Sequence, residues 1–489
     1  MEAYFIAAAE AMEEARRSIH FLNWAFEPET VLHPQPGGGG DDGDRIANFL
    51  KRLASTRPEL DIRILCWKSA LPVAATQHFF PLADRGAFDA SPVKFRLDGK
   101  LPLGACHHQK MLIIDDAVAF CGGGDIGPDR WDTPAHLDND PRREKTRYDN
   151  KAFDSRHEVM SIVDGPPAAA LGELFRRRWR RCTGEALPAP TITPPTAWPQ
   201  CVPPMFTDIA VGLSRTEGAW KGHRQVNECE ALHLASISAA RRLIYMESQY
   251  FTSPLLAAAI TERLAEPEGP EVVLISTEHS PSYFDQATMD RTRWRFIAAL
   301  QAADKFGRFQ IYSPVTTLGR TIIVHAKLAI IDDDLLRIGS ANINNRSLGF
   351  DTECDVSFEA DGDARGEIAR LRTGLVAHWI GCAGSVVEEA VQLHGGLCGA
   401  IEALRKAGYS RLRPITPGRL GPIGGLIANL HLGDPVEPED AWKPWKRRCA
   451  IEAKVRSFNL RRSGARPAAN EAEEETGRVV LAGVAPNAV

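Results

Sequence analysis

Two segments of the chain carry the same chemically competent residue types at the same spacing. A His-x-Lys-x4-Asp pattern occurs at His108, Lys110 and Asp115 and again at His325, Lys327 and Asp332. An imidazole can attack phosphorus or transfer a proton, and an ammonium group can neutralise a non-bridging phosphoryl oxygen. Two such pairs around one pocket suit cleavage of a phosphodiester through a phosphohistidine, with the second histidine acting as general acid and then as general base. Because the lysines supply the positive charge, we expect no metal ion and no other cofactor.

The expected strand geometry separates the motif residues by role. If each motif forms a strand, side chains alternate between its faces, so the histidine and the lysine point the same way. Asp115 and Asp332 would point to the opposite face of the strand, at its end, and we interpret them as structural residues that stabilise a turn. A glycine-rich turn starts seven residues after each aspartate. This turn is expected to bind phosphate or orient a lysine, and the candidates are Gly123, Asp125, Ser340 and Asn342.

A nucleophilic histidine needs a hydrogen-bond acceptor on its second ring nitrogen. Asp132 follows His108 by 24 residues (132 − 108), and Glu353 follows His325 by 28 (353 − 325). We therefore predict catalytic roles for these two carboxylates.

The segments that precede the two motifs correspond, which indicates a duplicated unit. Apolar runs typical of strands occur at residues 18–24, 61–67, 242–247 and 271–276. Helical patterns occur at residues 3–17, 44–55, 225–240 and 255–264. Strands that alternate with helices favour an α/β fold. The motifs lie 217 residues apart (325 − 108), which is the size of a domain rather than of a solenoid repeat.

The expected architecture is therefore two tandem α/β domains packed as a pseudo-twofold pair, with a small C-terminal extension. The predicted boundaries are 1–186 for the first domain, 187–222 for a Pro-rich linker, 223–384 for the second domain, 385–460 for the extension and 461–489 for a disordered tail. Within the extension, residues 442–448 mix tryptophans with basic residues. This composition suits either a membrane interface or a packed C-terminal segment.

Composition limits the possible partners and compartments. A net charge of −5 argues against a dedicated nucleic-acid binder, so we expect no nucleic-acid partner. None of the ten cysteines forms a Cys-x2-Cys pair, which argues against a zinc site of that kind. The first 17 residues lack the pattern of a secretory signal, and no apolar run reaches the roughly 20 residues of a membrane span. We expect a cytoplasmic or peripheral membrane protein and a monomer; export by another route or a mis-assigned start is left open.

Several longer segments resemble the phospholipase D superfamily, whose signature is the duplicated HKD motif. The resemblance covers roughly residues 3–382 and includes GGGDIGPDRWDTPAH at 122–136, RHEV at 156–159, GPPA at 165–168, RW at 178–179 and YMESQYF at 245–251. The first-half segments are similar to the phospholipase D subgroup in particular. The resemblance implies two phospholipase D-like domains and a metal-independent mechanism. It also implies that His108 is the nucleophile and His325 the general acid, with the reverse assignment still open.

The predicted function is hydrolysis of the distal phosphodiester of a phosphatidylcholine-like lipid at a membrane surface, which releases phosphatidic acid and the headgroup. The same catalytic residues serve cardiolipin and phosphatidylserine synthases, which transfer the phosphatidyl group to an alcohol, and they also serve nucleases. An inactive binding module is the non-enzymatic alternative. The sequence alone does not choose between hydrolysis and transfer.

Overall fold

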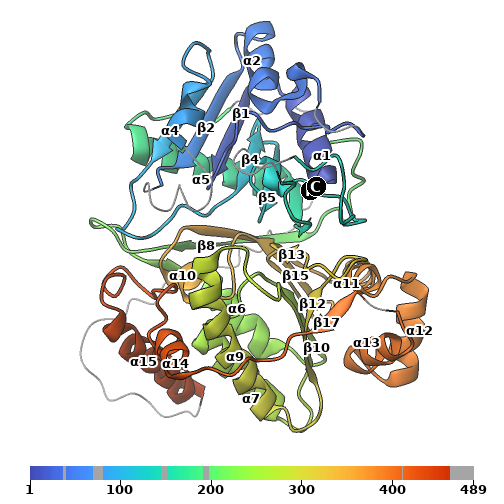
Figure 1. The fold of residues 1–489 in the computed structure, drawn as a ribbon. Helices are drawn as coiled ribbons and strands as arrows, with labels where there is room; N and C mark the ends of the chain where they lie inside the picture. Colours follow the sequence, from blue (N-terminus) through green and yellow to red (C-terminus); the bar gives the residue numbers. More distant parts are fainter. Residues whose placement is uncertain (37–39, 70–80, 145–150, 191–197, 410, 463–489) are drawn as a thin grey trace, which may run out of the picture.

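The computed structural model describes residues 1–489 except 37–39, 70–80, 145–150, 191–197, 410 and 463–489. It consists of two α/β halves stacked on each other, with the N-terminal half at the top of Figure 1. Each half contains one sheet with helices on both faces. The predicted α/β class is therefore confirmed.

The first half is built on a six-stranded sheet in the order β3-β2-β1-β4-β5-β7. Its strands are β1 (Ser18–Asn23), β2 (Asp61–Trp67), β3 (Lys94–Asp98), β4 (Met111–Ile114), β5 (Val118–Gly122) and β7 (Met160–Asp164). Side chains of β1 alternate between two cores. Ile19 and Phe21 pack in the cluster that contains α1 (Glu2–Glu13) and α2 (Ile46–Thr56). On the other face, His20 stacks on Phe175 of α5 (Gly165–Thr183) at 4.3 Å between ring centroids.

The second half is built on a nine-stranded sheet in the order β17-β12-β11-β10-β14-β15-β16-β8-β9. Its strands are β8 (Ala210–Glu217), β9 (Val226–Asn227), β10 (Leu243–Glu247), β11 (Glu271–Ile275), β12 (Phe309–Pro314), β14 (Leu328–Ile331), β15 (Leu335–Gly339), β16 (Glu353–Glu359) and β17 (Leu412–Pro414). One face packs against α6 (Glu228–Ala239), α7 (Pro254–Ala265) and α9 (Arg291–Ala303). The other face packs against α11 (Ala364–Ile380), α12 (Gly384–His394) and α13 (Leu397–Lys406).

The two sheets share a six-strand core of identical topology. In β3-β2-β1-β4-β5-β7 and in β12-β11-β10-β14-β15-β16, three parallel strands are followed by three antiparallel strands. The β4–β5 and β14–β15 hairpins each follow a His-x-Lys motif directly. This correspondence accounts for the repeated sequence pattern.

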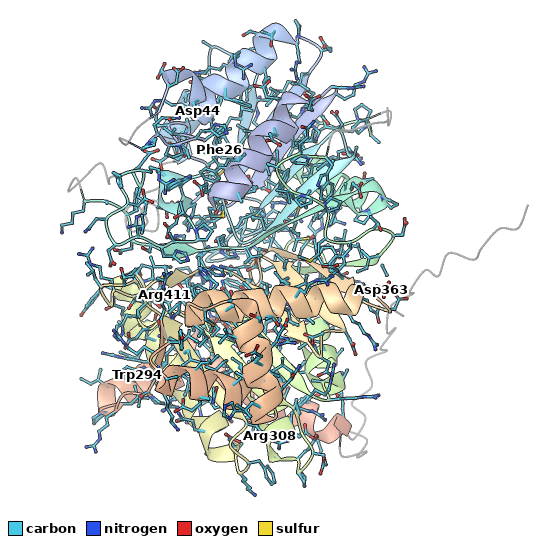
Figure 2. The ribbon with its side chains drawn as sticks, turned by 90° about the vertical axis from the view of Figure 1, so that its right-hand side faces the viewer. Phe26, Asp44, Trp294, Arg308, Asp363 and Arg411 are labelled. Atoms are coloured by element: carbon cyan, nitrogen blue, oxygen red, sulfur yellow. The ribbon has the colours of Figure 1, made fainter. Side chains whose placement is uncertain are left out.

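Backbone pairing joins the halves close to both motifs. The short strands β6 (Arg156–His157) and β13 (Ile323–Val324) pair in parallel, and a bridge links His107 to Thr352. The same buried hydrophobic cluster runs from α5 through β14–β16 to α11. Figure 2 shows the long helix α11, which Asp363 precedes, crossing the molecule where the halves meet.

Three sequence predictions differ from the structure. The motif histidines and lysines lie in extended chain before the strands, because β4 starts only at Met111 and β14 at Leu328. The predicted linker 187–222 contains β8, which completes the second sheet beside β16. The predicted extension is partly integrated as well, since β17 pairs with β12 before α14 (Pro422–Asn429) and α15 (Pro444–Arg462).

The predicted tail, residues 461–489, lies outside the described residues except for the end of α15. Among the described helices, none combines the length and the apolar character required to cross a bilayer.

Candidate active site

The motif aspartates fix the chain that carries each motif. Asp115 follows β4 and accepts hydrogen bonds from the backbone N–H groups of Arg17 and Ser18 at 2.7 Å. Asp332 does the same for the start of β10, and its carboxylate accepts from Arg242 N at 2.7 Å and Leu243 N at 2.8 Å. Both aspartates have positive φ angles, 57° and 56°, as expected at a tight turn. Their contacts tie the hairpins to the neighbouring strands and are structural.

The histidine of the first motif is oriented by a carboxylate of the second half. His108 Nδ1 lies 3.0 Å from both carboxylate oxygens of Glu353. Hydroxyl groups of Ser340 and Ser347 donate to the same carboxylate at 2.5 and 2.6 Å. Glu353 is fully buried, whereas 16% of the His108 side chain is exposed. Glu353 therefore leaves Nε2 of His108 as the ring nitrogen available to a substrate.

The second motif shows the reciprocal arrangement. His325 Nδ1 lies 2.5 Å from Glu158 Oε2, and Glu158 belongs to the first half. Backbone contacts support this crossing, because His325 N donates to His157 O at 2.8 Å and His108 N donates to Thr352 O at 2.9 Å. Each motif histidine thus depends on the other half for its orientation. Two imidazoles from distant parts of the chain are brought to the same junction between the halves.

The sequence prediction of the orienting carboxylates was partly wrong. Glu353 orients His108 rather than His325, because each motif packs across the junction instead of against its own half. Asp132 does not contact His108; it accepts from His136 Nδ1 and from Arg156 N, both at 2.8 Å. Sequence distance within one half was therefore a poor guide to these pairs.

Glu158 was missed as an orienting residue, although the duplication contains the signal for it. In the sheets, Gly122 of β5 is paired with Met160 and Gly339 of β15 with Asp355. Both glycines stand seven residues after a motif aspartate, so Met160 corresponds to Asp355. Two residues earlier in each half, Glu158 corresponds to Glu353. Aligning the two copies beyond the glycine turns identifies this acidic pair.

Two buried lysines supply positive charge between the histidines. Lys110 Nζ donates to His108 O at 2.8 Å, and Lys327 Nζ donates to His325 O. Asp125 Oδ2 lies 3.6 Å from Lys110 Nζ. Burial, assisted by the nearby Lys110 charge and opposed by the Glu158 carboxylate, lowers the pKa of Lys327 to about 7. Each lysine also lowers the pKa of both motif histidines, which places all four groups within one electrostatic site.

The protonation states suit a nucleophilic imidazole. Burial, followed by the lysine charges, holds the pKa values of His108 and His325 well below that of a free histidine. Burial raises the pKa values of Glu158 and Glu353, with the lysines opposing this shift. A neutral imidazole with its Nδ1–H donated to a glutamate presents an unprotonated Nε2. A phosphodiester anion that enters the site would offset the positive charge of the lysines and favour protonation of the second histidine.

The glycine-rich turns mainly support these groups. Asp125 Oδ1 accepts from Trp24 N at 2.9 Å and so anchors the end of β1. A Cβ on Gly123 would lie 2.2 Å from Glu158 Oε1 and 3.0 Å from His325 O, so a glycine is required for the close approach of these groups. Ser340 donates to Glu353, and Asn342 lies 3.5 Å from the Ser248 hydroxyl that donates to it. Any direct contact of these turns with phosphate remains a prediction.

Comparisons with known proteins agree with this geometry. Residues 234–370 match the family model "Cardiolipin synthase, PLD-like domain". The chain is 24% identical over 420 residues to phospholipase D A of Dictyostelium discoideum and 24% identical over 430 residues to phospholipase D1 of Saccharomyces cerevisiae. These matches cover 73% and 70% of this chain but only 32% and 25% of the relatives. The chain thus spans about a quarter to a third of the length of these relatives.

Further matches support the same assignment. Cardiolipin synthase A of Pseudomonas putida is 28% identical over 270 residues, which cover 55% of this chain and 45% of that protein. The crystal structure of phosphatidylserine synthase from Haemophilus influenzae shares the fold, with a TM-score of 0.52, 14% identity, and coverage of 93% of this chain and 92% of that one. The duplicated fold, the paired motifs and these similarities relate the chain to the phospholipase D superfamily.

Proposed function

We propose that this protein is a phospholipase D that hydrolyses the distal phosphodiester of a phosphatidylcholine-like glycerophospholipid. The products are phosphatidic acid and the free headgroup. The observation that carries the proposal is the crossed pairing of His108 with Glu353 and of His325 with Glu158 around two buried lysines. Such a site can hold one phosphorus atom between a nucleophile and a proton donor. The catalytic roles of His108, Lys110, His325, Lys327 and Glu353 follow from this proposal.

In the first step, Nε2 of His108 attacks phosphorus while Glu353 holds Nδ1–H. A P–N bond forms, and the bond from phosphorus to the headgroup oxygen breaks. His325, protonated in the substrate complex, gives its proton to that oxygen as the headgroup leaves. The ammonium groups of Lys110 and Lys327 stabilise the charge on the non-bridging oxygens.

In the second step, the neutral His325 takes a proton from water as the water oxygen attacks phosphorus. The P–N bond then breaks, and phosphatidic acid leaves with His108 restored. His325 alternates between its imidazolium form and its neutral form during these steps, and Glu158 stabilises the imidazolium form. Each glutamate therefore acts as an orienting and charge-balancing partner, and the lysines take the place that a metal ion holds in other phosphodiesterases.

A lipid substrate is supported by apolar side chains close to the first motif. Leu103 is 76% exposed in the loop that leads to His108, and Trp442 is 65% exposed. The Trp442 ring lies against this loop, 3.5 Å from where a Cβ on Gly104 would stand. Trp445 is also 65% exposed, whereas Arg447 is buried and bonded to backbone carbonyls. The tryptophans thus suit insertion at a membrane interface, and Arg447 has a packing role.

A transphosphatidylase is the second candidate, because the matched family model carries a cardiolipin synthase description and the fold is shared with a phosphatidylserine synthase. The first step would be unchanged, and an alcohol would replace water in the second. The two candidates therefore differ only in the acceptor that reaches the phosphohistidine.

Parallel assays separate these functions. The purified protein would be incubated with phosphatidylcholine vesicles, with phosphatidylglycerol vesicles, and with single-stranded DNA. Choline release with formation of phosphatidic acid is expected, and His108→Ala serves as the control for contaminating activity. Cardiolipin formation in the second mixture without choline release in the first would favour the transferase. Cleavage of DNA alone, or no turnover of any substrate, would overturn the lipid hydrolase proposal.

A further inference from the structure

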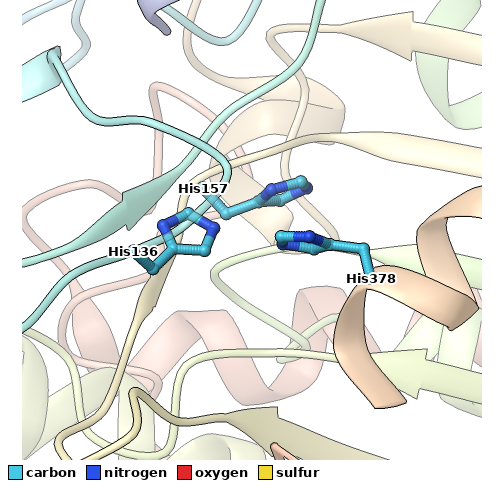
Figure 3. A group of neighbouring side chains, drawn as sticks. All are labelled: His136, His157 and His378. Carbon is cyan, nitrogen blue, oxygen red and sulfur yellow. The ribbon is translucent and has the colours of Figure 1, made fainter. Parts of the chain in front are cut away.

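Three histidines outside the active site converge at the junction of the two halves. His136 lies in the loop after η2 (Pro128–Arg130), His157 ends β6, and His378 lies in the last turn of α11. One ring nitrogen from each lies within 4.8 Å of the others. Figure 3 shows the three rings turned toward a common centre from three different segments. The mechanism proposed above assigns these three imidazoles no role.

Buried carboxylates hold the second ring nitrogen of two of these histidines. His136 Nδ1 lies 2.8 Å from Asp132 Oδ2, and His157 Nε2 lies 2.7 Å from Glu247 Oε2. Both carboxylates are fully buried. His136 Nε2 and His157 Nδ1 are therefore not held by these carboxylates. The buried His136 Nε2 has no hydrogen-bond partner within the described part of the chain. Carboxylate–histidine pairs of this kind typically fix the orientation and the tautomer of metal-binding imidazoles.

The geometry points to a binding site for a divalent transition-metal ion, such as Zn²⁺, formed by His136, His157 and His378. A tetrahedral site with metal–nitrogen bonds of about 2.1 Å needs nitrogens about 3.4 Å apart, so small side-chain rotations close the present arrangement. His157 and His378 are only partly buried, which gives the ion an entry path and leaves a fourth position for water. Trp379 forms one wall, with its ring stacked on His136 at 5.9 Å and edge-on to His157 at 4.6 Å.

The bound ion would connect the halves close to the catalytic residues. Two ligands come from the first half and one from α11 of the second. His157 immediately precedes Glu158, and its carbonyl accepts hydrogen bonds from His325 N at 2.8 Å and Ala326 N at 3.2 Å. The metal would thus hold the segment that positions Glu158 and His325 without contacting substrate. Its role is structural, so the prediction of metal-independent phosphoryl chemistry is unaffected.

Direct metal binding tests this inference. The full-length protein would be freed of metal with a chelator, dialysed, and titrated with Zn²⁺ by calorimetry and with Co²⁺ by visible absorption. We expect one equivalent of Zn²⁺ and the absorption bands of tetrahedral Co²⁺. Saturating Zn²⁺ is expected to raise the Tm by about 3–5 °C, since a ligand present at about 100 times its Kd stabilises by mass action.

Variants assign the ligands. His378→Asn should weaken Zn²⁺ binding at least about 100-fold and abolish the Tm increase, and Asp132→Asn should weaken binding about 10–100-fold. His394→Asn, at an exposed site on α12, is the matched control and should behave like the parent protein. Absence of Zn²⁺ binding by the parent protein, or unchanged binding by folded His378→Asn, would overturn the proposal. If His378→Asn does not fold, the number of imidazole ligands that bind Co²⁺ in the parent protein is the deciding measurement. Fewer than three imidazole ligands would refute the proposed site.

Discussion

Replacing Glu158 with Gln tests whether the carboxylate that the structure identifies orients the general acid. Glu158 is buried and lies 2.5 Å from His325 Nδ1, so the amide would leave the imidazolium form without its countercharge. Removing one partner of a buried pair costs about 3–5 kcal/mol. At about 1.4 kcal/mol per tenfold in rate, turnover should decrease about 10²–10⁴-fold.

The leaving group shows which step is affected. With a phosphatidyl-p-nitrophenol substrate, the departing phenolate needs little protonation, so Glu158→Gln should still give a rapid burst of p-nitrophenol. Release of the phosphohistidine needs His325 as a base, so slow steady-state turnover should follow the burst. Glu353→Gln should instead remove the burst, because its partner His108 is the proposed nucleophile. A burst in Glu353→Gln and none in Glu158→Gln would reverse the assignment of the two histidines.

Asp132→Asn is the matched control for this experiment. Asp132 is as buried as Glu158 but contacts His136 and Arg156 rather than a motif histidine. This variant should therefore lose thermal stability while its kcat stays within about tenfold of the parent value. The reasoning is refuted if Glu158→Gln retains kcat within about threefold, or if Asp132→Asn loses as much as Glu158→Gln at a temperature where both are folded.

Five further outcomes are expected. His108→Ala and His325→Ala should each reduce choline release at least about 10³-fold, and the double variant should be little worse, because the two residues act as a unit. Since the Lys327 pKa is about 7 and its ammonium form is the active one, kcat/KM should decrease as pH rises above 7, and Lys327→Arg should move this decrease to higher pH. The same depressed pKa means that the unfolded chain binds the extra proton between pH 7 and 10, so the contribution of Lys327 to stability should increase over that range in denaturant titrations. Trp442→Ala should reduce turnover of phosphatidylcholine vesicles about tenfold and leave a soluble short-chain lipid unaffected, whereas equal losses on both would argue against interfacial insertion. Chelators should lower the Tm by a few degrees but leave turnover at 25 °C within about threefold, and complete loss of activity would contradict lysine-based charge neutralisation.

Local patterns were sufficient to predict much of the fold. The apolar run at 61–67 coincides with β2, and the helical pattern at 255–264 lies within α7, because strong periodicity and local propensity agree there. The strand β8 was predicted as linker because its segment follows a Pro-rich stretch, and its place in the sheet depends on pairing with the distant β16. Contacts between segments 140 residues apart leave no periodic signal in a single sequence.

The contrast between local patterns and long-range contacts also explains which residues of the site could be predicted from the sequence. His108, Lys110, His325 and Lys327 were identifiable because duplication repeats them at fixed spacing. Which glutamate contacts which histidine was not identifiable, since Glu353 and His108 are 245 residues apart and Glu158 and His325 are 167 apart. Packing across the junction, which a sequence pattern does not encode, determines these pairs.

The crossed pairs make the catalytic site a property of the assembled halves. Within one half alone, each histidine would lack the carboxylate that selects its tautomer, and each glutamate would be left without its imidazole. A buried carboxylate without a partner becomes protonated rather than charged, so the isolated half-site would lose both the orientation and the charge balance that the mechanism needs. The strand pair β6–β13 lies directly before Glu158 and His325, and therefore sets the position of this crossed pair. A metal ion bound by His136, His157 and His378 would therefore act on the His325–Glu158 contact through this strand pair.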